Sequence, residues 1–232
     1  MIRSHRFSFP EQPLPLQESE PVAQFEIGSM QNFVYLILDW KSRCAAIIDP
    51  QKDLSLPLGA LDRYGFELTH ILLTHTHHDH VAGVPELLDL KPNARLAVHR
   101  DDAHRLRITP KYKTRITHLI DGDRVQIGEL KIEALHTPGH SAGELCYFLN
   151  GTSPVLFSGD TLFIRDCGRT DLPTGSTAQM YESLQKLKTL PGETVLLPGH
   201  HYARECFSTL SQEWRESPPL QCRNLEELEA LP

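Results

Sequence analysis

The sequence predicts an α/β fold whose functional residues gather at one edge of a sheet sandwich. Short apolar runs of strand length recur along the chain, and helical apolar spacing follows several of them. Side chains able to bind metal directly follow four of these runs. Because loops at strand ends are carried by a rigid scaffold, ligands far apart in the sequence are expected to converge there.

The first half of the chain predicts four strands and two helices. The run from Phe33 to Leu38 is continuously apolar, as expected of a strand buried on both faces. The strands are expected at residues 24–28, 33–39, 44–49 and 71–74, and the helices at 56–64 and 81–90. The fourth strand runs directly into a histidine cluster, which is therefore expected on the loop before the second helix.

The second half repeats this pattern of strands with polar residues at their ends. Strands are expected at residues 130–135, 145–149, 155–157 and 195–197. Met180, Leu184 and Leu187 have helical spacing, which predicts a helix over 177–190 that stops before a Pro-Gly pair. One further helix after residue 209 and a short acidic helix at 224–231 are expected to form the carboxy-terminal tail.

The chain is expected to hold one domain and an arm. Residues 1–22 are rich in Pro, Gln and Glu and predict an extended arm, and residues 23–232 predict a single domain with a short helical tail. The amino-terminal residues do not resemble a signal peptide, and no apolar run approaches the ~20 residues of a membrane span. Five widely spaced cysteines without a Cys-x-x-Cys pair favour reduced thiols in a cytoplasmic protein.

Charge and size restrict the partners. The formal net charge of −7 argues against non-specific binding of nucleic acid, which needs a basic surface. A small molecule is the expected partner, with neither nucleic acid nor membrane involved. The oligomeric state is open, and a dimer is compatible with the sequence.

Seven residues form the candidate metal-binding set. They are His75, His77, Asp79, His80, His140, Asp160 and His200. Neutral imidazole and carboxylate are the groups that zinc and ferrous iron bind, and buried carboxylates need a partner or a metal. Residues two apart point the same way in extended structure, so His75 and His77 can bind one ion while Asp79 and His80 face a second. Asp160 can bridge two ions roughly 3.5–4 Å apart.

This set resembles the metallo-β-lactamase superfamily, whose pattern is His-x-His-x-Asp-His followed by His, Asp and His. All seven positions are present, and the resemblance covers about residues 24–205. It implies a four-layer αβ/βα sandwich with the site at one edge. It also implies one metal held by His75, His77 and His140, a second held by Asp79, His80 and His200, and Asp160 as the bridge. Asp79 and Asp160 are the implied catalytic carboxylates.

Within the family, two stretches resemble hydroxyacylglutathione hydrolases (glyoxalase II). They are Thr74 to Gly83, and Gly159 to Phe163 followed by Cys167-Gly168-Arg169. The resemblance implies that Arg169 binds the glutathione carboxylate. Two departures stand out: only about 30 residues follow His200, where glyoxalase II has a long helical domain, and Asp171 replaces an expected aromatic residue.

Tyr147 is the second candidate for substrate binding. It lies in a predicted strand, so the alternative is a core residue with its hydroxyl at the edge of the sheet.

The implied activity is hydrolysis of a thioester of glutathione or a related acyl-thiol. Two Zn²⁺ ions sharing a water would lower its pKa from 15.7 to about 7 and make a bridging hydroxide. The leaving thiol has a pKa of about 8.5, so no strong general acid is needed. One Fe²⁺, or a mixture of Zn, Fe and Mn, is the alternative metal content.

A second relative fits other residues. The stretch Ile164 to Asp171 is similar to persulfide dioxygenases, which act on glutathione persulfide with one ferrous iron. That resemblance implies an iron site of His75, His140 and Asp160. Those enzymes usually carry a small residue in place of His78 and an Ala-His pair in place of Gly199-His200. A non-catalytic metal-binding protein is disfavoured because such relatives usually lose ligands, and all seven are present here.

Overall fold

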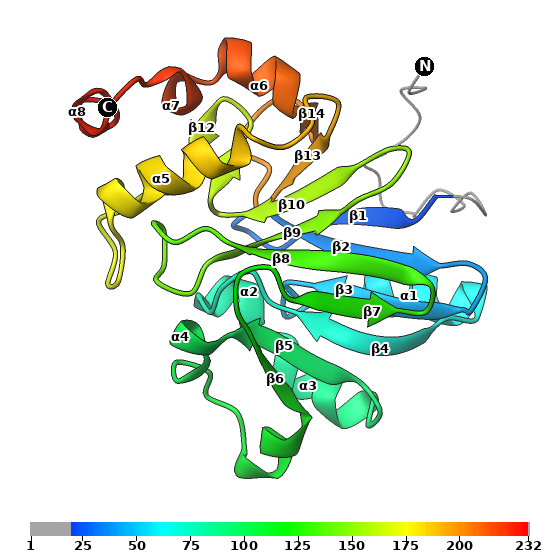
Figure 1. Ribbon diagram of the computed structural model, residues 1–232. Helices are drawn as coiled ribbons and strands as arrows, with labels where there is room; N and C mark the ends of the chain where they lie inside the picture. Colours follow the sequence, from blue (N-terminus) through cyan, green and yellow to red (C-terminus); the bar gives the residue numbers. More distant parts are fainter. Residues whose placement is uncertain (1–19, 232) are drawn as a thin grey trace.

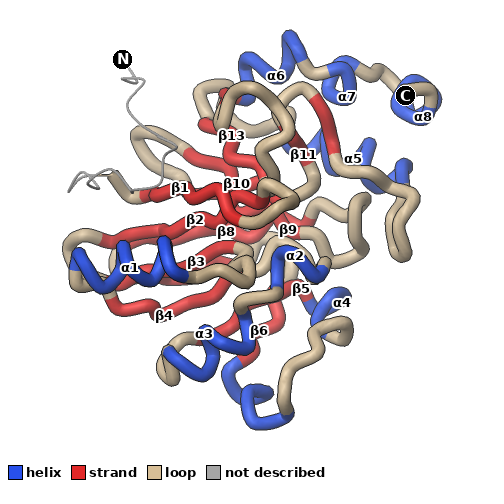
Figure 2. Tube along the Cα trace, turned by 180° about the vertical axis from the view of Figure 1, so that it is seen from behind, coloured by secondary structure: helices blue, strands red, loops and turns tan. Residues whose placement is uncertain are grey.

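Two six-stranded sheets packed face to face form the centre of the molecule (Figure 1). The computed structural model describes residues 20–231, so residues 1–19 of the predicted arm lie outside the described part of the chain. Helices cover the outer faces of both sheets, which makes four layers. Figure 2 shows α1 and α3 lying across the outer face of the first sheet. The four-layer sandwich predicted from the sequence is confirmed.

The first sheet has the strand order β1-β2-β3-β4-β5-β6, antiparallel from β1 to β3 and parallel from β3 to β6. Its strands are β1 (Val22–Ile27), β2 (Asn32–Asp39), β3 (Cys44–Ile48), β4 (Glu67–Leu72), β5 (Arg95–His99) and β6 (Ile116–Leu119). The helices of this half are α1 (Ser55–Tyr64), α2 (His78–Val81), α3 (Val84–Leu90) and α4 (Arg100–Ala103), with a 3₁₀ helix at Pro110–Arg115.

The second sheet has the order β14-β13-β10-β9-β8-β7, with β10 and β13 parallel and the other pairs antiparallel. Its strands are β7 (Arg124–Ile127), β8 (Leu130–His136), β9 (Leu145–Leu149), β10 (Val155–Gly159), β13 (Val195–Pro198) and β14 (Ser208–Thr209). A two-stranded ribbon is formed by β11 (Leu162–Phe163) and β12 (Asp166–Cys167). The helices of this half are α5 (Thr177–Leu187), α6 (Leu210–Glu216), α7 (Pro218–Gln221) and α8 (Leu225–Glu229).

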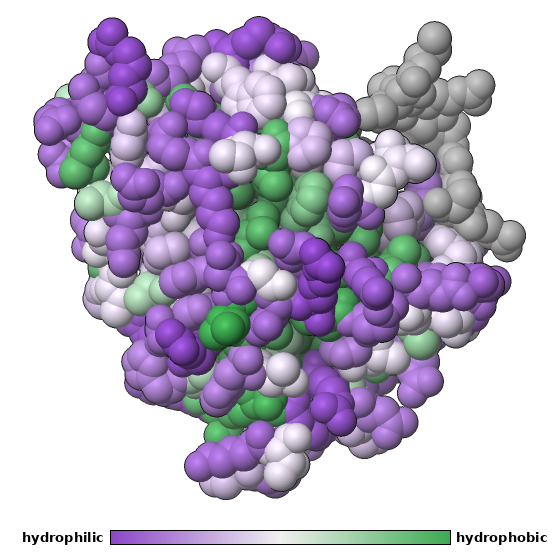
Figure 3. Space-filling view, in the orientation of Figure 1, coloured by the Kyte–Doolittle hydropathy of each residue, from purple (hydrophilic) through white to green (hydrophobic). Residues whose placement is uncertain are grey.

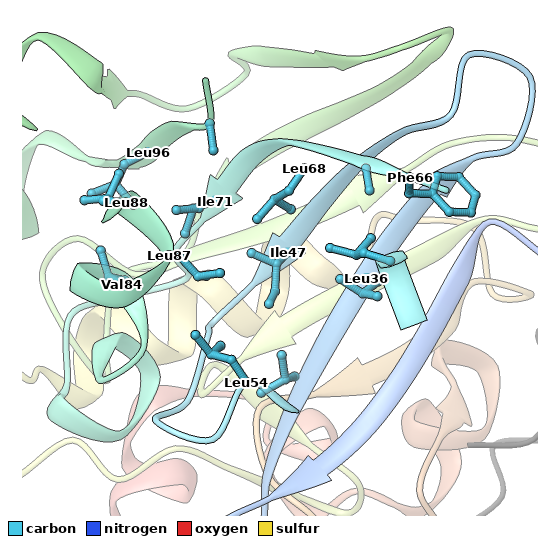
Figure 4. Close-up of a cluster of buried hydrophobic side chains, with 14 of the residues drawn as sticks. Leu36, Ile47, Leu54, Phe66, Leu68, Ile71, Val84, Leu87, Leu88 and Leu96 are labelled. Atoms are coloured by element: carbon cyan, nitrogen blue, oxygen red, sulfur yellow. The ribbon is translucent and has the colours of Figure 1, made fainter. Parts of the chain in front are cut away.

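Strand β2 shows how the layers are held. Successive side chains of a strand point to opposite faces, so Tyr35 and Ile37 enter the core between the sheets while Val34 and Leu36 face the helices. Figure 4 shows Leu36, Ile47 and Ile71 of the first sheet beside Leu54 and Leu87 in this outer core. Burial on both faces explains why the run was continuously apolar, as predicted.

The helix expected at residues 81–90 is two helices. A Cβ at Gly83 would lie 2.4 Å from the carbonyl oxygen of Gln51, so the chain passes too close to that loop for any side chain. Pro85 then lies in the first turn of α3, where a missing backbone N–H is tolerated. As a result His78, Asp79 and His80 belong to the short helix α2 and not to a loop.

Two other expectations about helices need correction, and several strands, among them the short β11, β12 and β14, were not predicted. Helix α5 ends at Leu187 rather than residue 190. The tail holds three short helices, since Pro218 and Pro219 follow the end of α6 and start α7. Strands β5 to β7 were not predicted.

The strands that carry the candidate ligands end at a common edge of the sandwich. Ile48 of β3 pairs with Leu72 of β4, and β10 runs parallel to β13. At this edge the Tyr35 hydroxyl donates to the Pro198 carbonyl at 2.6 Å and the Tyr147 hydroxyl donates to the Leu73 carbonyl at 2.8 Å. Both bonds cross from one sheet to the other and fix the ligand loops.

Figure 3 displays the hydropathy of one face of the molecule. That face is mostly hydrophilic, and apolar side chains are visible in scattered patches. Among residues 20–231 we find no helix with the length and apolar character needed to cross a bilayer. The five cysteines are free thiols.

Candidate metal centre

The structure brings all seven candidate ligands together at the site edge. His75 and His77 follow β4, Asp79 and His80 lie in α2, and the others follow β8, β10 and β13. Six of the seven side chains are buried, and His77 is half-buried. The side with the more exposed His77 is therefore the more open approach to the centre.

The first triad consists of His75, His77 and His140. Each offers a ring nitrogen, and these atoms lie within 4.8 Å of one another. The closest pair is His77 Nδ1 and His140 Nε2, 2.9 Å apart. This spacing suits three ligands that share one ion.

The second triad consists of Asp79, His80 and His200, with ligand atoms again within 4.8 Å of one another. His80 Nε2 and His200 Nε2 are 3.1 Å apart, and Asp79 Oδ2 lies 3.3 Å and 3.4 Å from them. Backbone contacts hold His200 in place, since the Phe33 N–H donates to the Gly199 carbonyl at 2.8 Å.

Asp160 lies between the triads. Its Oδ2 is 3.4 Å from His140 Nε2 and 3.4 Å from His200 Nε2, and its Oδ1 is 3.6 Å from His80 Nε2. One carboxylate therefore faces ligands of both triads, as a bridge between two ions requires.

In three of the histidines the ring nitrogen that points away from the centre, Nδ1, has a hydrogen-bond acceptor. His140 Nδ1 lies 2.8 Å from the Arg169 carbonyl, and His200 Nδ1 lies 2.9 Å from the Met30 carbonyl. A carbonyl can only accept, so these nitrogens carry the hydrogen and leave Nε2 with a lone pair. His80 Nδ1 lies 3.0 Å from the Asp49 carboxylate, which accepts the hydrogen on Nδ1. Partners of this kind are typical of metal-ligating histidines.

Orphaned atoms test whether the centre fits a metal. Within the described chain, His75 Nε2 and Asp160 Oδ1 are buried without a hydrogen-bond partner, although buried polar atoms are nearly always paired. His80 Nε2 and His200 Nε2 lie 3.1 Å apart, close enough to share one ion. The donor set therefore fits a divalent metal.

Electrostatics favour the ligand forms of the first triad. Burial lowers the pKa of His75 well below its usual value, and the neighbouring His80 and His140 lower it further. Burial and then His140 lower the pKa of His77 to about 4. Both imidazoles are therefore neutral at pH 7, which is the form that binds metal.

The carboxylates and His80 form a charged group beside this neutral triad. Burial alone would raise the pKa of Asp79, but hydrogen bonds from His80 and Asn32 hold it below its usual value. Burial opposes a proton on His80, yet Asp160 and Asp49 raise its pKa well above normal. A cation in the second triad would replace that proton as the partner of the carboxylates.

Two glycines make room for Asp160. A Cβ at Gly199 would lie 2.3 Å from Asp160 Oδ1. Gly159 has φ +50°, and a Cβ there would lie 2.6 Å from both Glu144 Oε1 and Thr74 Cβ. These contacts give a physical reason for Ser-Gly-Asp and Pro-Gly-His at the two strand ends.

The candidate substrate residues are placed differently. The Tyr147 side chain is fully buried between the sheets and its hydroxyl is bonded to the Leu73 carbonyl, which corrects the substrate-binding assignment in favour of the core residue. Arg169 lies beside the first triad, because its carbonyl accepts from His140. Its guanidinium is 65% exposed and makes a bidentate pair with Asp171 at 2.6 and 2.7 Å.

Several residues of the centre were not predicted. Asp49, Asn32, Glu144 and Asp102 are buried polar residues that contact ligands or ligand loops. Asp49 alone gave a signal, because an acid directly after an apolar strand resembles Asp160.

An aromatic rim was also missed. Tyr202 is 58% exposed and stacks on His200 with centroids 4.7 Å apart and an interplanar angle of 12°. The ring of Phe163 meets Tyr202 edge-on at 5.3 Å. An apolar portion of a ligand at the centre would meet this wall.

A further cluster of His99, Asp101 and His136 does not have the geometry of a metal site. The two rings are stacked at 4.0 Å and 8°, so their in-plane lone pairs run parallel and do not converge. His99 Nδ1 accepts from the Asp101 N–H at 3.2 Å, and His136 Nε2 lies 2.9 Å from the Ala142 carbonyl.

Comparisons with known proteins agree with this geometry. The model of the metallo-β-lactamase superfamily matches residues 28–200. A hydroxyacylglutathione hydrolase of Rhodospirillum rubrum is 38% identical over 174 residues, which cover 75% of this chain and 63% of that protein. This chain thus spans less than two thirds of that relative.

Solved structures show the same fold. The ETHE1 protein of Myxococcus xanthus matches with a TM-score of 0.79 and 30% identity, covering 91% of this chain and 92% of that one. A protein crystallised in a di-iron-bound form matches with a TM-score of 0.69 and 30% identity, covering 84% of this chain and 98% of that one. With a family match over most of its length, this chain belongs to the metallo-β-lactamase superfamily.

Proposed function

We propose that this chain is a metal-dependent hydrolase that cleaves a thioester of glutathione or a related acyl-thiol. The observation that carries the proposal is a pair of complete ligand triads that share Asp160. The relative named hydroxyacylglutathione hydrolase supports the choice of substrate class.

Two Zn²⁺ ions are the proposed cofactors, with His75, His77 and His140 holding one, Asp79, His80 and His200 the other, and Asp160 both. Divalent ions there would polarise a carbonyl and lower the pKa of water to about 7. Nitrogen and carboxylate donors also suit iron or manganese, and the structural relative in di-iron form favours a dinuclear centre.

The protein residues contribute position and protonation state. Asp160 fixes the separation of the two triads, and the neutral His77 marks the open side from which a substrate can approach. The leaving thiol, with a pKa of about 8.5, can depart as thiolate without a dedicated acid.

Substrate contacts are proposed at the rim. Tyr202 and Phe163 would cover an apolar part of the substrate. Arg169 would bind a carboxylate of the thiol carrier only by sharing or displacing Asp171, so we expect a smaller contribution than from an unpaired arginine.

A persulfide dioxygenase is the second candidate, favoured by the structural similarity to ETHE1 along nearly the full length of both chains. One Fe²⁺ would then be held by His75, His140 and Asp160. The second triad weighs against it, because all three of its ligands are buried and converge.

One purified sample of the full chain separates the two functions. Metal content and oxygen uptake are measured while the protein is offered an acyl-glutathione thioester and, separately, glutathione persulfide. The hydrolase predicts about two metals per chain and thioester cleavage without oxygen. One iron per chain with oxygen consumed on the persulfide would establish the dioxygenase instead.

A further inference from the structure

We propose that Asp102 and Glu144 form a buried carboxylate brace, joined through Ser141, that positions the first triad, and that Asp102 sets the metal affinity of this triad separately from that of the second. Neither acid belongs to the candidate ligand set. Both lie behind the first triad, with exposures of 1% for Asp102 and 0% for Glu144. The inference rests on the metal centre of the proposed hydrolase and not on the reaction it catalyses.

Asp102 ties together the two loops that carry the first triad. It accepts hydrogen bonds from the Gly143 N–H at 3.0 Å, the Ser141 hydroxyl at 3.0 Å and the Thr76 hydroxyl at 3.3 Å. Thr76 lies between His75 and His77, and Ser141 follows His140. One carboxylate therefore contacts the chain next to all three ligands.

The loop is shaped to accept Asp102. A Cβ at Gly143 would lie 2.7 Å from atoms of Asp102, so glycine is needed for this approach. Helix α4 is held against the same loop by the stack of His99 on His136, and the Arg105 guanidinium donates to the Thr174 hydroxyl at 3.0 Å. Figure 1 shows α4 near α2 at the site end of the sheets.

Glu144 supports the inner side of the triad. Its Oε1 accepts from the Asp160 N–H at 3.0 Å and lies 3.4 Å from His75 Nδ1. Its Oε2 lies 3.4 Å from the Ser141 hydroxyl oxygen. The Thr74 hydroxyl, 3.0 Å from His75 Nδ1, and Glu144 together engage that side of the ring and leave the unpartnered Nε2 for the first metal position. Glu144 also fixes the backbone of the bridging residue.

The second triad is held by other groups. The Met30 carbonyl accepts from His200, Asn32 donates to Asp79 at 2.8 Å, and Asp49 pairs with His80. Since Asp102 contacts none of these, loss of the Asp102 carboxylate should disturb the first position and spare the second. Burying a carboxylate costs free energy unless it is hydrogen-bonded or paired. Mutating a residue that hydrogen-bonds to a metal ligand typically lowers metal affinity ~10–100-fold.

The test measures metal affinity on the full chain. Metal-free protein is titrated with Zn²⁺ against a competing chelator to obtain stepwise binding constants for the original chain and for the variants Asp102→Asn, Glu144→Gln and Ser141→Ala. Asp102→Asn should weaken one constant by ~10–100-fold, and Ser141→Ala should weaken the same constant by less; both should leave the other constant unchanged. Glu144→Gln also alters the bond to the Asp160 N–H, so it should weaken both constants. Asp39→Asn is the matched control, because Asp39 is also a buried acid bonded to a serine and a backbone N–H, but at the opposite edge.

Two backgrounds identify the affected position. In His200→Ala, where the first triad stays complete, adding Asp102→Asn should weaken the remaining constant. In His140→Ala, where the second triad stays complete, the same addition should have no effect. If Asp102→Asn weakened the Zn²⁺ binding constant equally in both backgrounds, or in neither, the proposed brace would be wrong.

Other outcomes are also decisive. Ser141→Ala removes only a hydroxyl, so it tests the brace if an acid variant unfolds. If the original chain binds one metal, the dinuclear hydrolase is wrong, yet the brace is still tested, since it should weaken that one constant. Oxygen uptake and thioester cleavage are separate readouts and do not enter this comparison.

Discussion

Each of the two edges of the sandwich holds a buried aspartate, but the protein satisfies the hydrogen-bonding atoms of only one of them. At the edge away from the centre, Asp39 accepts from the Ser42 hydroxyl and from the Glu129 N–H at 2.8 Å, which ties the β2–β3 turn to the β7–β8 turn. At the centre, Asp160 Oδ1 is buried without a partner among the described residues.

This difference indicates that Asp39 stabilises the fold, whereas Asp160 is placed to bind a ligand. Asp39 is satisfied by the protein itself, so it needs no ligand and stabilises the fold. Asp160 is surrounded by imidazoles whose outer nitrogens are already engaged, so its free oxygen faces the space that a cation would occupy. Substitutions at the two edges should therefore have opposite consequences for metal binding and stability.

The largest effect is expected from Asp160→Ala. Both triads lose their shared ligand, so metal content and thioester cleavage should fall together, by more than the ~10–100-fold typical of an outer partner. Metal analysis and an activity assay on the same sample provide the measurement. If Asp160→Ala kept its turnover and bound two metals, Asp160 would not be a metal ligand. Asp39→Asn is the control and should keep full metal content.

A substitution next to Asp160 tests the centre without removing a ligand. Gly199→Ala would place a Cβ 2.3 Å from Asp160 Oδ1, the oxygen that faces His80, so we expect about one metal per chain instead of about two. Gly151→Ala is the control, because a Cβ at Gly151 meets nothing within 4 Å. Full loading of Gly199→Ala would show that Asp160 can move without loss of the second position.

Most of the centre could be predicted because its ligands follow apolar strands in sequence. His140 and Asp160 each stand next to a glycine at the end of a buried strand, so local sequence marked both identity and position. The buried β2 strand was equally clear, since a sheet covered on both faces leaves no polar positions. The four-layer arrangement followed from the family resemblance.

What could not be predicted depends on long-range contacts. Asp102 sits in an ordinary Arg-Asp-Asp stretch, and its role comes from bonds to residues 39 and 41 positions away. At the break between α2 and α3 the Gly83 N–H donates to the Pro50 carbonyl at 2.8 Å, a contact with a residue 33 positions away. Tyr147 was assigned to substrate because a strand pattern does not show where a hydroxyl points.

The smallest effect is expected at the opposite edge, from Asp39→Asn. Burial alone would raise the pKa of Asp39, but bonds from the Ser42 hydroxyl and backbone N–H groups hold it below the usual 3.8. The charged form is thus favoured by folding, so its stabilisation is fully present above the unfolded pKa near 3.8 and disappears as pH falls through the lower folded value. Urea unfolding should show Asp39→Asn less stable by about 1–2 kcal/mol at pH 7. The difference should shrink on acidification toward pH 3, with metal content unchanged. A gap that widens in acid would mean that Asp39 is protonated in the fold, and the contrast between a satisfied and an unsatisfied carboxylate would then be lost.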